Sequence, residues 1–103
     1  MRAEQSLRLE ILSGPLDGAV VTLTRETAWS SEGTGPLAFP WDAELGHPQA
    51  WFLPVDDTWV LQGTTSQHGT YRMNTEEPVN DGQQISLAPG DVLKASSTWL
   101  RVV

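Results

Sequence analysis

The sequence lacks cysteine and is poor in basic residues. Without cysteine, the chain has no disulfide framework, no thiol nucleophile and no thiolate ligand for a metal. Its 6 lysines and arginines, scattered singly, are outnumbered by 13 aspartates and glutamates, which gives a formal net charge of -7. Nucleic acids and anionic membranes attract basic patches, so we expect neither as a partner. A partner with a basic surface is easier to accommodate, although excess acidic residues also serve solubility alone.

Long apolar runs and helical patterns are absent as well. No run approaches the roughly 20 apolar residues that a transmembrane helix needs. Arg8 and Glu10 interrupt the N-terminal segment where a signal peptide would have its apolar stretch. No segment keeps the apolar spacing of a helix over several turns, and 9 glycines and 7 prolines interrupt the chain repeatedly. We therefore expect a soluble, cytoplasmic protein built from other elements.

Short strand patterns are present instead. Residues 7–11 alternate apolar and polar side chains, and residues 19–24 are rich in β-branched ones, so the glycine- and proline-containing turn between them predicts a hairpin. Further strands are expected over residues 25–29, 50–55, 58–62, 70–73, 78–79, 84–87, 92–95 and 98–103. Pro54 indicates an edge position or a bulge. About ten or eleven short, mostly antiparallel strands predict an all-β sandwich, a single domain over residues 1–103 with its core at about 7–103.

Five tryptophans supply much of the bulk that such a core needs. Trp51, Trp59 and Trp99 lie within strand patterns, so we expect them in the core or on a sheet face. Trp29 and Trp41 flank the predicted loops and are candidates for an exposed contact surface.

A polar apex between two strands carries the densest polar chemistry of the chain, the segment Ser66-Gln67-His68-Gly69-Thr70-Tyr71. Polar loops held by strands commonly present side chains to a partner. This segment and three others together resemble a forkhead-associated (FHA) domain. The other three are residues 14–23 (GPLDGAVVTL), 45–52 (LGHPQAWF) and 81–93 (DGQQISLAPGDVL). The resemblance implies an FHA-like β-sandwich of about eleven strands whose loops at one end bind phosphothreonine in a partner peptide.

The chain departs from the family's pattern at that end. Phosphate binding needs a cation together with hydroxyl and amide donors. The family's arginine, serine, buried histidine and peptide-gripping asparagine fall on Glu32, Gly46, Gln49 and His68. No lysine or arginine lies between Arg25 and Arg72. Replacing arginine by glutamate removes a charge-assisted bond worth roughly 1.5–3 kcal/mol and adds repulsion, so we predict a degenerate phosphothreonine pocket.

The leading hypothesis is therefore a protein–protein interaction module that binds a protein or peptide without recognising phosphothreonine. Its candidate partner-binding residues are Ser66, Gln67, His68, Thr70, Glu32, Gly46, His47 and Arg72. The expected structural turn residues are Gly69, Gly90 and Asp91, with Gly69 fitting a turn of positive φ. One alternative is a phosphothreonine reader that uses Ser66, His68 and Thr70, with Arg72 as the cation. The other is a structural domain that forms homo-oligomers or packs on a neighbouring domain.

Metal and catalytic chemistry have weaker support. His47 and His68 lie in loops with Glu32, Asp42 and Glu44, but the spacing matches no known metal motif, so we expect no metal and no cofactor. His68 could instead supply a cation below neutral pH and bind an anion weakly.

A catalytic triad is the remaining possibility to weigh. Ser66, His68 and Asp81 include the residue types of a triad, but their spacing suggests neither an oriented histidine nor an oxyanion hole. We therefore expect no enzymatic activity.

Overall fold

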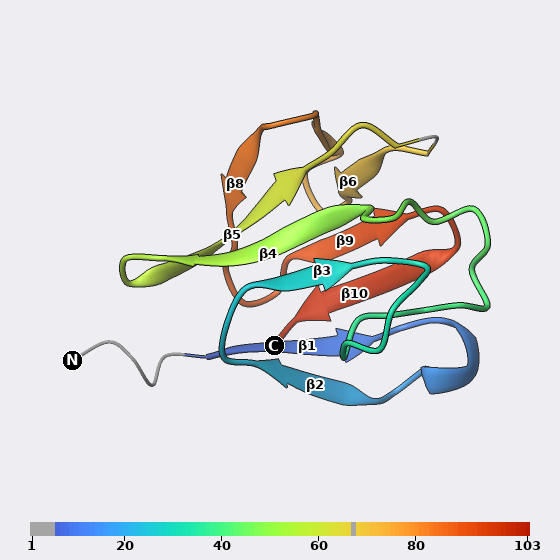
Figure 1. Ribbon diagram of the computed structural model, residues 1–103. Helices are drawn as coiled ribbons and strands as arrows, with labels where there is room; N and C mark the ends of the chain where they lie inside the picture. The colour runs from blue at the N-terminus through green and yellow to red at the C-terminus, as the bar shows by residue number, and fades with distance from the viewer. Residues whose placement is uncertain (1–5, 67) are drawn as a thin grey trace.

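The computed structural model describes residues 6–66 and 68–103. Gln67, one of the predicted partner-binding residues, lies outside the described residues. The described chain forms ten strands in two sheets, together with one short 3-10 helix at Gly14–Leu16 (Figure 1). Every strand pair is antiparallel, and the only parallel contacts in the described part of the chain are two isolated bridges. The predicted all-β sandwich is confirmed.

The larger sheet has six strands in the order β2-β1-β10-β9-β6-β7. Their bounds are β1 Leu7–Ile11, β2 Val20–Leu23, β6 Thr70–Arg72, β7 Glu77–Val79, β9 Val92–Ala95 and β10 Thr98–Val102. The predicted hairpins β1–β2 and β9–β10 both lie in this sheet. The sheet therefore joins the two ends of the described chain.

The smaller sheet has four strands in the order β3-β4-β5-β8. Their bounds are β3 Thr27–Trp29, β4 Ala50–Val55, β5 Thr58–Gly63 and β8 Gln84–Ser86. Pro54 lies beyond Phe52, where the pairing with β3 stops, so this part of β4 pairs with β5 alone. A proline fits here because its missing N–H faces no neighbouring strand. The predicted edge position is confirmed for this half of the strand.

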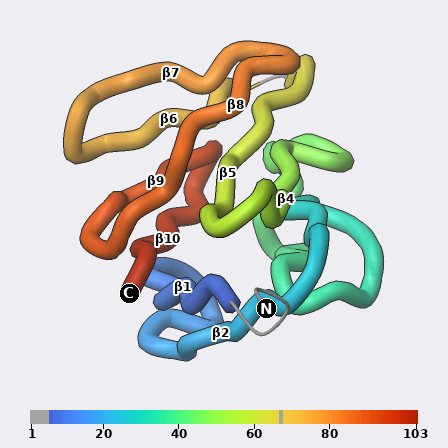
Figure 2. The backbone as a smooth tube through the Cα atoms, turned by 90° about the vertical axis from the view of Figure 1, so that its left-hand side faces the viewer, coloured from blue at the N-terminus to red at the C-terminus, as the bar shows by residue number. Residues whose placement is uncertain are grey.

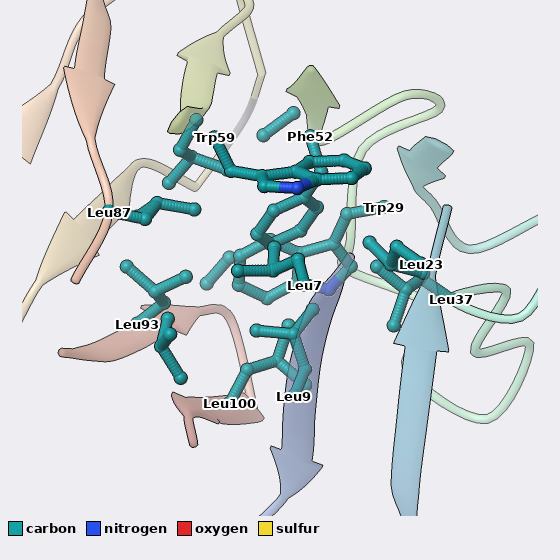
Figure 3. Packing of buried hydrophobic residues seen from close by; sticks show 14 of the residues in the cluster. Leu7, Leu9, Leu23, Trp29, Leu37, Phe52, Trp59, Leu87, Leu93 and Leu100 are labelled. Carbon is teal, nitrogen blue, oxygen red and sulfur yellow. The ribbon is translucent and has the colours of Figure 1, made fainter. Parts of the chain in front are cut away.

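The core lies between the two sheets, which form facing layers when viewed along the strands (Figure 2). Period-two alternation produces it: Leu7, Leu9 and Ile11 are buried, while Arg8 between them is exposed. Phe52 and Trp29 pack at its centre with ring centroids 6.0 Å apart (Figure 3).

The tryptophans divide differently from the prediction. Trp29 is 0% exposed, so its assignment to an exposed contact surface is wrong. It ends β3, and strand alternation turns its side chain into the core. Trp41 is 43% exposed, as expected, and its indole packs on Phe39 and over Gly14. Trp59 is buried, and Trp51 and Trp99 are half-buried on their strands.

The long loops gather at one end of the sandwich, on the right of Figure 1. We call residues 30–48, 64–66, 68–69 and 96–97 the loop end. Gly90 and Asp91 lie at the opposite end, where the chain enters β9. Gly90 has a φ of 96°, and the Asp91 carboxylate accepts a hydrogen bond from the Ala88 N–H at 2.9 Å. No helix within the described ranges is long and apolar enough to span a membrane.

Candidate functional site

Gln49, which directly precedes β4, ties the segments of the loop end together. Its side chain is fully buried, and its carboxamide oxygen accepts a hydrogen bond from the Gly46 N–H at 2.6 Å. Its amide nitrogen donates to Ser66 Oγ at 3.1 Å, the His68 carbonyl at 2.7 Å and Thr70 Oγ1 at 2.9 Å. One buried side chain therefore ties the segment before β4 to the segment before β6. Ser66 and Thr70 serve this network, and Thr70 is itself buried.

His47 organises the loop after β3. Its Nδ1 lies 2.9 Å from Ser30 Oγ, and its Nε2 lies 3.5 Å from a carboxylate oxygen of Glu32. The Glu32 N–H donates to Ser30 Oγ at 3.0 Å, and the Ser31 N–H donates to the Gly46 carbonyl at 3.1 Å. Glu32 and His47 are both more than half exposed. The carboxylate of Glu32 therefore faces solvent at the mouth of the loop end.

His68 makes a second contact of the same kind. Its Nε2 lies 2.8 Å from a carboxylate oxygen of Glu44, while its carbonyl accepts a hydrogen bond from Ser66 Oγ at 2.7 Å. Each histidine of the chain thus contacts a glutamate rather than the other histidine. No group of three or more possible metal ligands occurs among residues 6–66 and 68–103.

Gly69 does not have the predicted positive φ, so that expectation is wrong. A Cβ added at Gly69 would lie 3.2 Å from atoms of the Tyr71 ring. Glycine is favoured here because the ring approaches the backbone closely, rather than because the turn is left-handed.

Asp42 fastens the loop end to the β9–β10 turn. Its carboxylate accepts hydrogen bonds from Ser96 Oγ at 2.7 Å, the Ser97 N–H at 3.1 Å and Thr98 Oγ1 at 2.7 Å. Burial alone would raise the pKa of Asp42, but the bonds from Thr98, Ser96 and Ser97 outweigh it and hold that pKa below its ordinary value. The carboxylate therefore acts as an ionised anchor.

Arg72 does not lie with the other predicted site residues. Its guanidinium contacts Glu77 at 2.5 Å and Asp91 at 3.3 Å, and it donates to the Ser86 carbonyl at 2.9 Å. Hydrogen bonding to Glu77 is the main reason that the pKa of Arg72 is raised, and burial opposes it. The side chain is directed toward the turn before β9 and away from the loop end.

A shallow hollow of about 410 Å³ opens where the loop end meets β6 and β9. It is lined by Glu44, His68, Gly69, Tyr71, Lys94, Ser96 and Ser97. Lys94 supplies the basic side chain of this lining. The sequence analysis did not point to Lys94, because this residue lies in β9, more than twenty residues beyond the polar segment at residues 66–71.

Solved structures with the same architecture include FHA domains. The FHA domain of a hypothetical protein from Arabidopsis thaliana gives a TM-score of 0.80 at 22% identity, over 97% of this chain and 86% of that one. The FHA domain of FhaA, solved with the intracellular domain of Rv3910, gives 0.78 at 21% identity, over 95% and 100%. An FHA domain analysed for phosphothreonine-dependent interactions gives 0.77 at 20% identity, over 95% of each chain. This chain has the FHA fold.

No protein-family model matches the sequence, and no curated protein matches it either. The likeness is therefore one of fold. Within that FHA fold, Gln49 occupies the position that the sequence assigns to the family's buried histidine, and it is indeed buried and bonded. The predicted phosphate-binding positions hold the carboxylate of Glu32 and the bare backbone of Gly46.

Sequence reasoning missed two residues that organise this end. Asp42 carried no motif, and the sequence analysis considered it only as a neighbour of the two histidines in a possible metal site. Gln49 stood at a recognisable FHA position, but a glutamine there gives no sign that its carboxamide bonds four separate groups. The structure brings the remaining predicted residues Ser66, His68, Thr70, Glu32, Gly46 and His47 together at the loop end.

Proposed function

We propose that the chain is a non-catalytic protein–protein interaction module that binds its partner without recognising phosphothreonine. The FHA fold supports the interaction role, since the solved FHA domain of FhaA is held in a complex with another protein's domain. The proposal about phosphothreonine depends on the residues of this chain alone. A cytoplasmic location, which the sequence analysis predicts, is part of the proposal.

The observation that carries the proposal is the charge of the loop end. Glu32 and Glu44 are both more than half exposed there, and each contacts a histidine. A phosphothreonine side chain carries nearly two negative charges, so these carboxylates repel it. Arg72, the sequence's candidate cation, is held by Glu77 and Asp91 instead. The loop end is therefore arranged for a ligand that is not a phosphodianion.

The contacts of Ser66 and His68 support a non-catalytic role. Ser66 Oγ donates to the backbone carbonyl of His68, and the His68 ring contacts Glu44. A serine nucleophile needs its hydroxyl proton directed at a histidine nitrogen. The hydroxyl of Ser66 is used to close its own turn.

Fluorescence anisotropy with a phosphothreonine peptide library tests the proposal, with the same library carrying unphosphorylated threonine as the matched control. We expect the two libraries to give indistinguishable titrations. Micromolar binding that depends on the phosphate contradicts the proposal.

A second candidate function is a phosphothreonine reader with a divergent pocket. The observation that favours it is Lys94, which lines the same hollow as His68. In this version Lys94 replaces the missing arginine, and Arg72 has no role. Binding of a phosphopeptide that is lost in Lys94→Gln and kept in Arg25→Gln would establish this reader and exclude the first proposal.

A further inference from the structure

One row of side chains crosses the outer face of the six-stranded sheet. Trp99 lies opposite Lys94, Lys94 opposite Tyr71, and Tyr71 opposite Pro78. Directly opposed residues of antiparallel strands place their side chains on the same face. The chain neighbours of Lys94 and Trp99 on both sides are buried, so this row faces away from the core. We call these four residues the outer-face row.

Tyr71 and Lys94 form a ridge between two hollows. One is the hollow at the loop end, and the other, about 440 Å³, is lined by Tyr71, Met73, Glu76 and Lys94. Tyr71 is 42% exposed, and Met73 is half-buried beside it. Aromatic residues and methionine are enriched at the centres of protein–protein interfaces. Tyr71 and Trp99 of the outer-face row, with Met73 at the edge of the second hollow, bring residues of these types together on one face.

Lys94 is the cation of the outer-face row, and none of the ion pairs within the described ranges includes it. Arg101, on the same sheet, pairs with Glu10. The Lys94 ammonium lies instead 5.7 Å from the centroid of the Trp99 ring. A carboxylate of a partner can therefore bind Lys94 without breaking an existing ion pair.

We propose that the outer-face row is the docking surface for a partner segment that places a carboxylate against Lys94 and an apolar side chain beside Tyr71 and Met73. The inference deepens the proposed function, on which it rests, because a sheet-face contact needs no phosphate. A single carboxylate fits better than a phosphodianion, since Glu44 lines one hollow and Glu76 the other. The partner is thus an unphosphorylated peptide segment with an acidic residue next to an apolar one.

Nuclear magnetic resonance titration of the 15N-labelled chain tests the inference. The probe is a pool of end-capped, unphosphorylated peptides with a fixed Leu-Asp pair among random residues, and the matched control pool has Leu-Asn. We expect the Leu-Asp pool to shift the Tyr71 and Lys94 amides and the Trp99 indole signal. Loss of the carboxylate removes a charge-assisted bond, so the Leu-Asn pool binds about tenfold more weakly. Equal binding of both pools, or binding by neither, overturns the inference.

Variants separate the outer-face row from the loop end. Lys94→Gln is expected to remove the preference for the Leu-Asp pool, and Tyr71→Ala to weaken both pools. Arg101→Gln, which makes the same charge change on the same sheet, is the control and keeps the preference. Dispersed spectra confirm that each variant is folded, and unchanged binding by Lys94→Gln overturns the inference.

The two proposals fail in different ways. Phosphate-dependent shifts at residues 30–36 or 64–66, given by a phosphothreonine pool, contradict the proposed function. Shifts at those same loop residues given by the unphosphorylated Leu-Asp pool contradict only the outer-face docking surface.

Discussion

At the scale of single residues, Gln49 holds more of the loop end than any motif residue does. Its carboxamide satisfies the Gly46 N–H and shares hydrogen bonds with Ser66, His68 and Thr70 inside a region where water does not reach it. Buried polar groups that lose their partner cost free energy, because the desolvation of each one is no longer offset. The Gln49 side chain, from the residue directly before β4, thus stabilises the loop end.

We predict that Gln49→Ala lowers the free energy of unfolding by roughly 2–3 kcal/mol, since several buried groups lose their partner together. Chemical denaturation measures the change. Gln84→Ala is the control, because the Gln84 side chain bonds only Gln62 on the exposed face of its sheet and is expected to cost under about 0.5 kcal/mol. Equal effects of the two substitutions would show that the Gln49 network does not stabilise the fold.

Asp42 gives the chain a stability that depends on pH. Its folded-state pKa lies below the ordinary value of 3.8, so its contribution is complete above that pH and is lost as pH falls through the lower folded pKa. We predict that Asp42→Asn costs about 1–3 kcal/mol at pH 7, because bonds to a charged acceptor become bonds to a neutral one.

Urea unfolding across acid pH checks this prediction. The difference between the native chain and Asp42→Asn is expected to shrink once the pH drops below 3.8, since the native carboxylate is then protonated as well. A difference that stays constant down to the acid limit would contradict the role assigned to ionised Asp42.

Residue types alone predicted part of this end. The structure brings Glu32, Gly46 and His68 into one loop region, and each stands at a fixed offset from a segment that resembles an FHA motif. Arg72 could not be assigned, because its direction depends on Glu77 and Asp91, which approach it only after β6, β7 and β9 have paired. The sequence analysis expected a glycine at position 69 because the turn would have a positive φ. The structure shows instead that the Tyr71 ring lies close to the Gly69 backbone.

At the scale of elements, glycine is favoured in two turns for different physical reasons. Gly90 has a φ of 96°, which disfavours any residue with a Cβ, and a Cβ there would meet nothing within 4 Å. Gly69 has an ordinary φ, but a Cβ there would press on the exposed Tyr71 ring, which can move aside.

We therefore predict that Gly90→Ala lowers the free energy of unfolding by about 1–2 kcal/mol, the cost of a left-handed conformation for an L-residue. Gly69→Ala is expected to cost less and to shift the Tyr71 ring signals. Thermal unfolding and aromatic proton spectra of the two variants measure these effects. A larger loss for Gly69→Ala than for Gly90→Ala would reverse the assignment.

The strands themselves were the most predictable elements. Period-two alternation places Leu7, Leu9 and Ile11 in the core wherever β1 finds its partners, so the pattern alone was sufficient. Trp29 was misassigned because β3 is only three residues long, too short for alternation to show which face it turns inward. The sheet that a short strand joins decides which face of the strand turns toward the core. The sequence of so short a strand does not show which face that is.

At the scale of the whole molecule, the formal net charge of -7 favours a monomer, because like-charged copies repel one another. Size-exclusion chromatography with light scattering is expected to give the monomer mass at all loading concentrations. A mass that rises with concentration, and rises further in high salt, would instead support the alternative of a structural domain that forms homo-oligomers.

The central claim is that the FHA fold is kept here while phosphothreonine recognition is not. Its most direct test is the affinity ratio between phosphothreonine and threonine peptide pools, measured by isothermal titration for the native chain and for a Glu32→Arg variant. The account predicts a ratio near one for the native chain and a rise of roughly tenfold when the cation is restored. A native chain that already prefers the phosphorylated pool by that margin would contradict it.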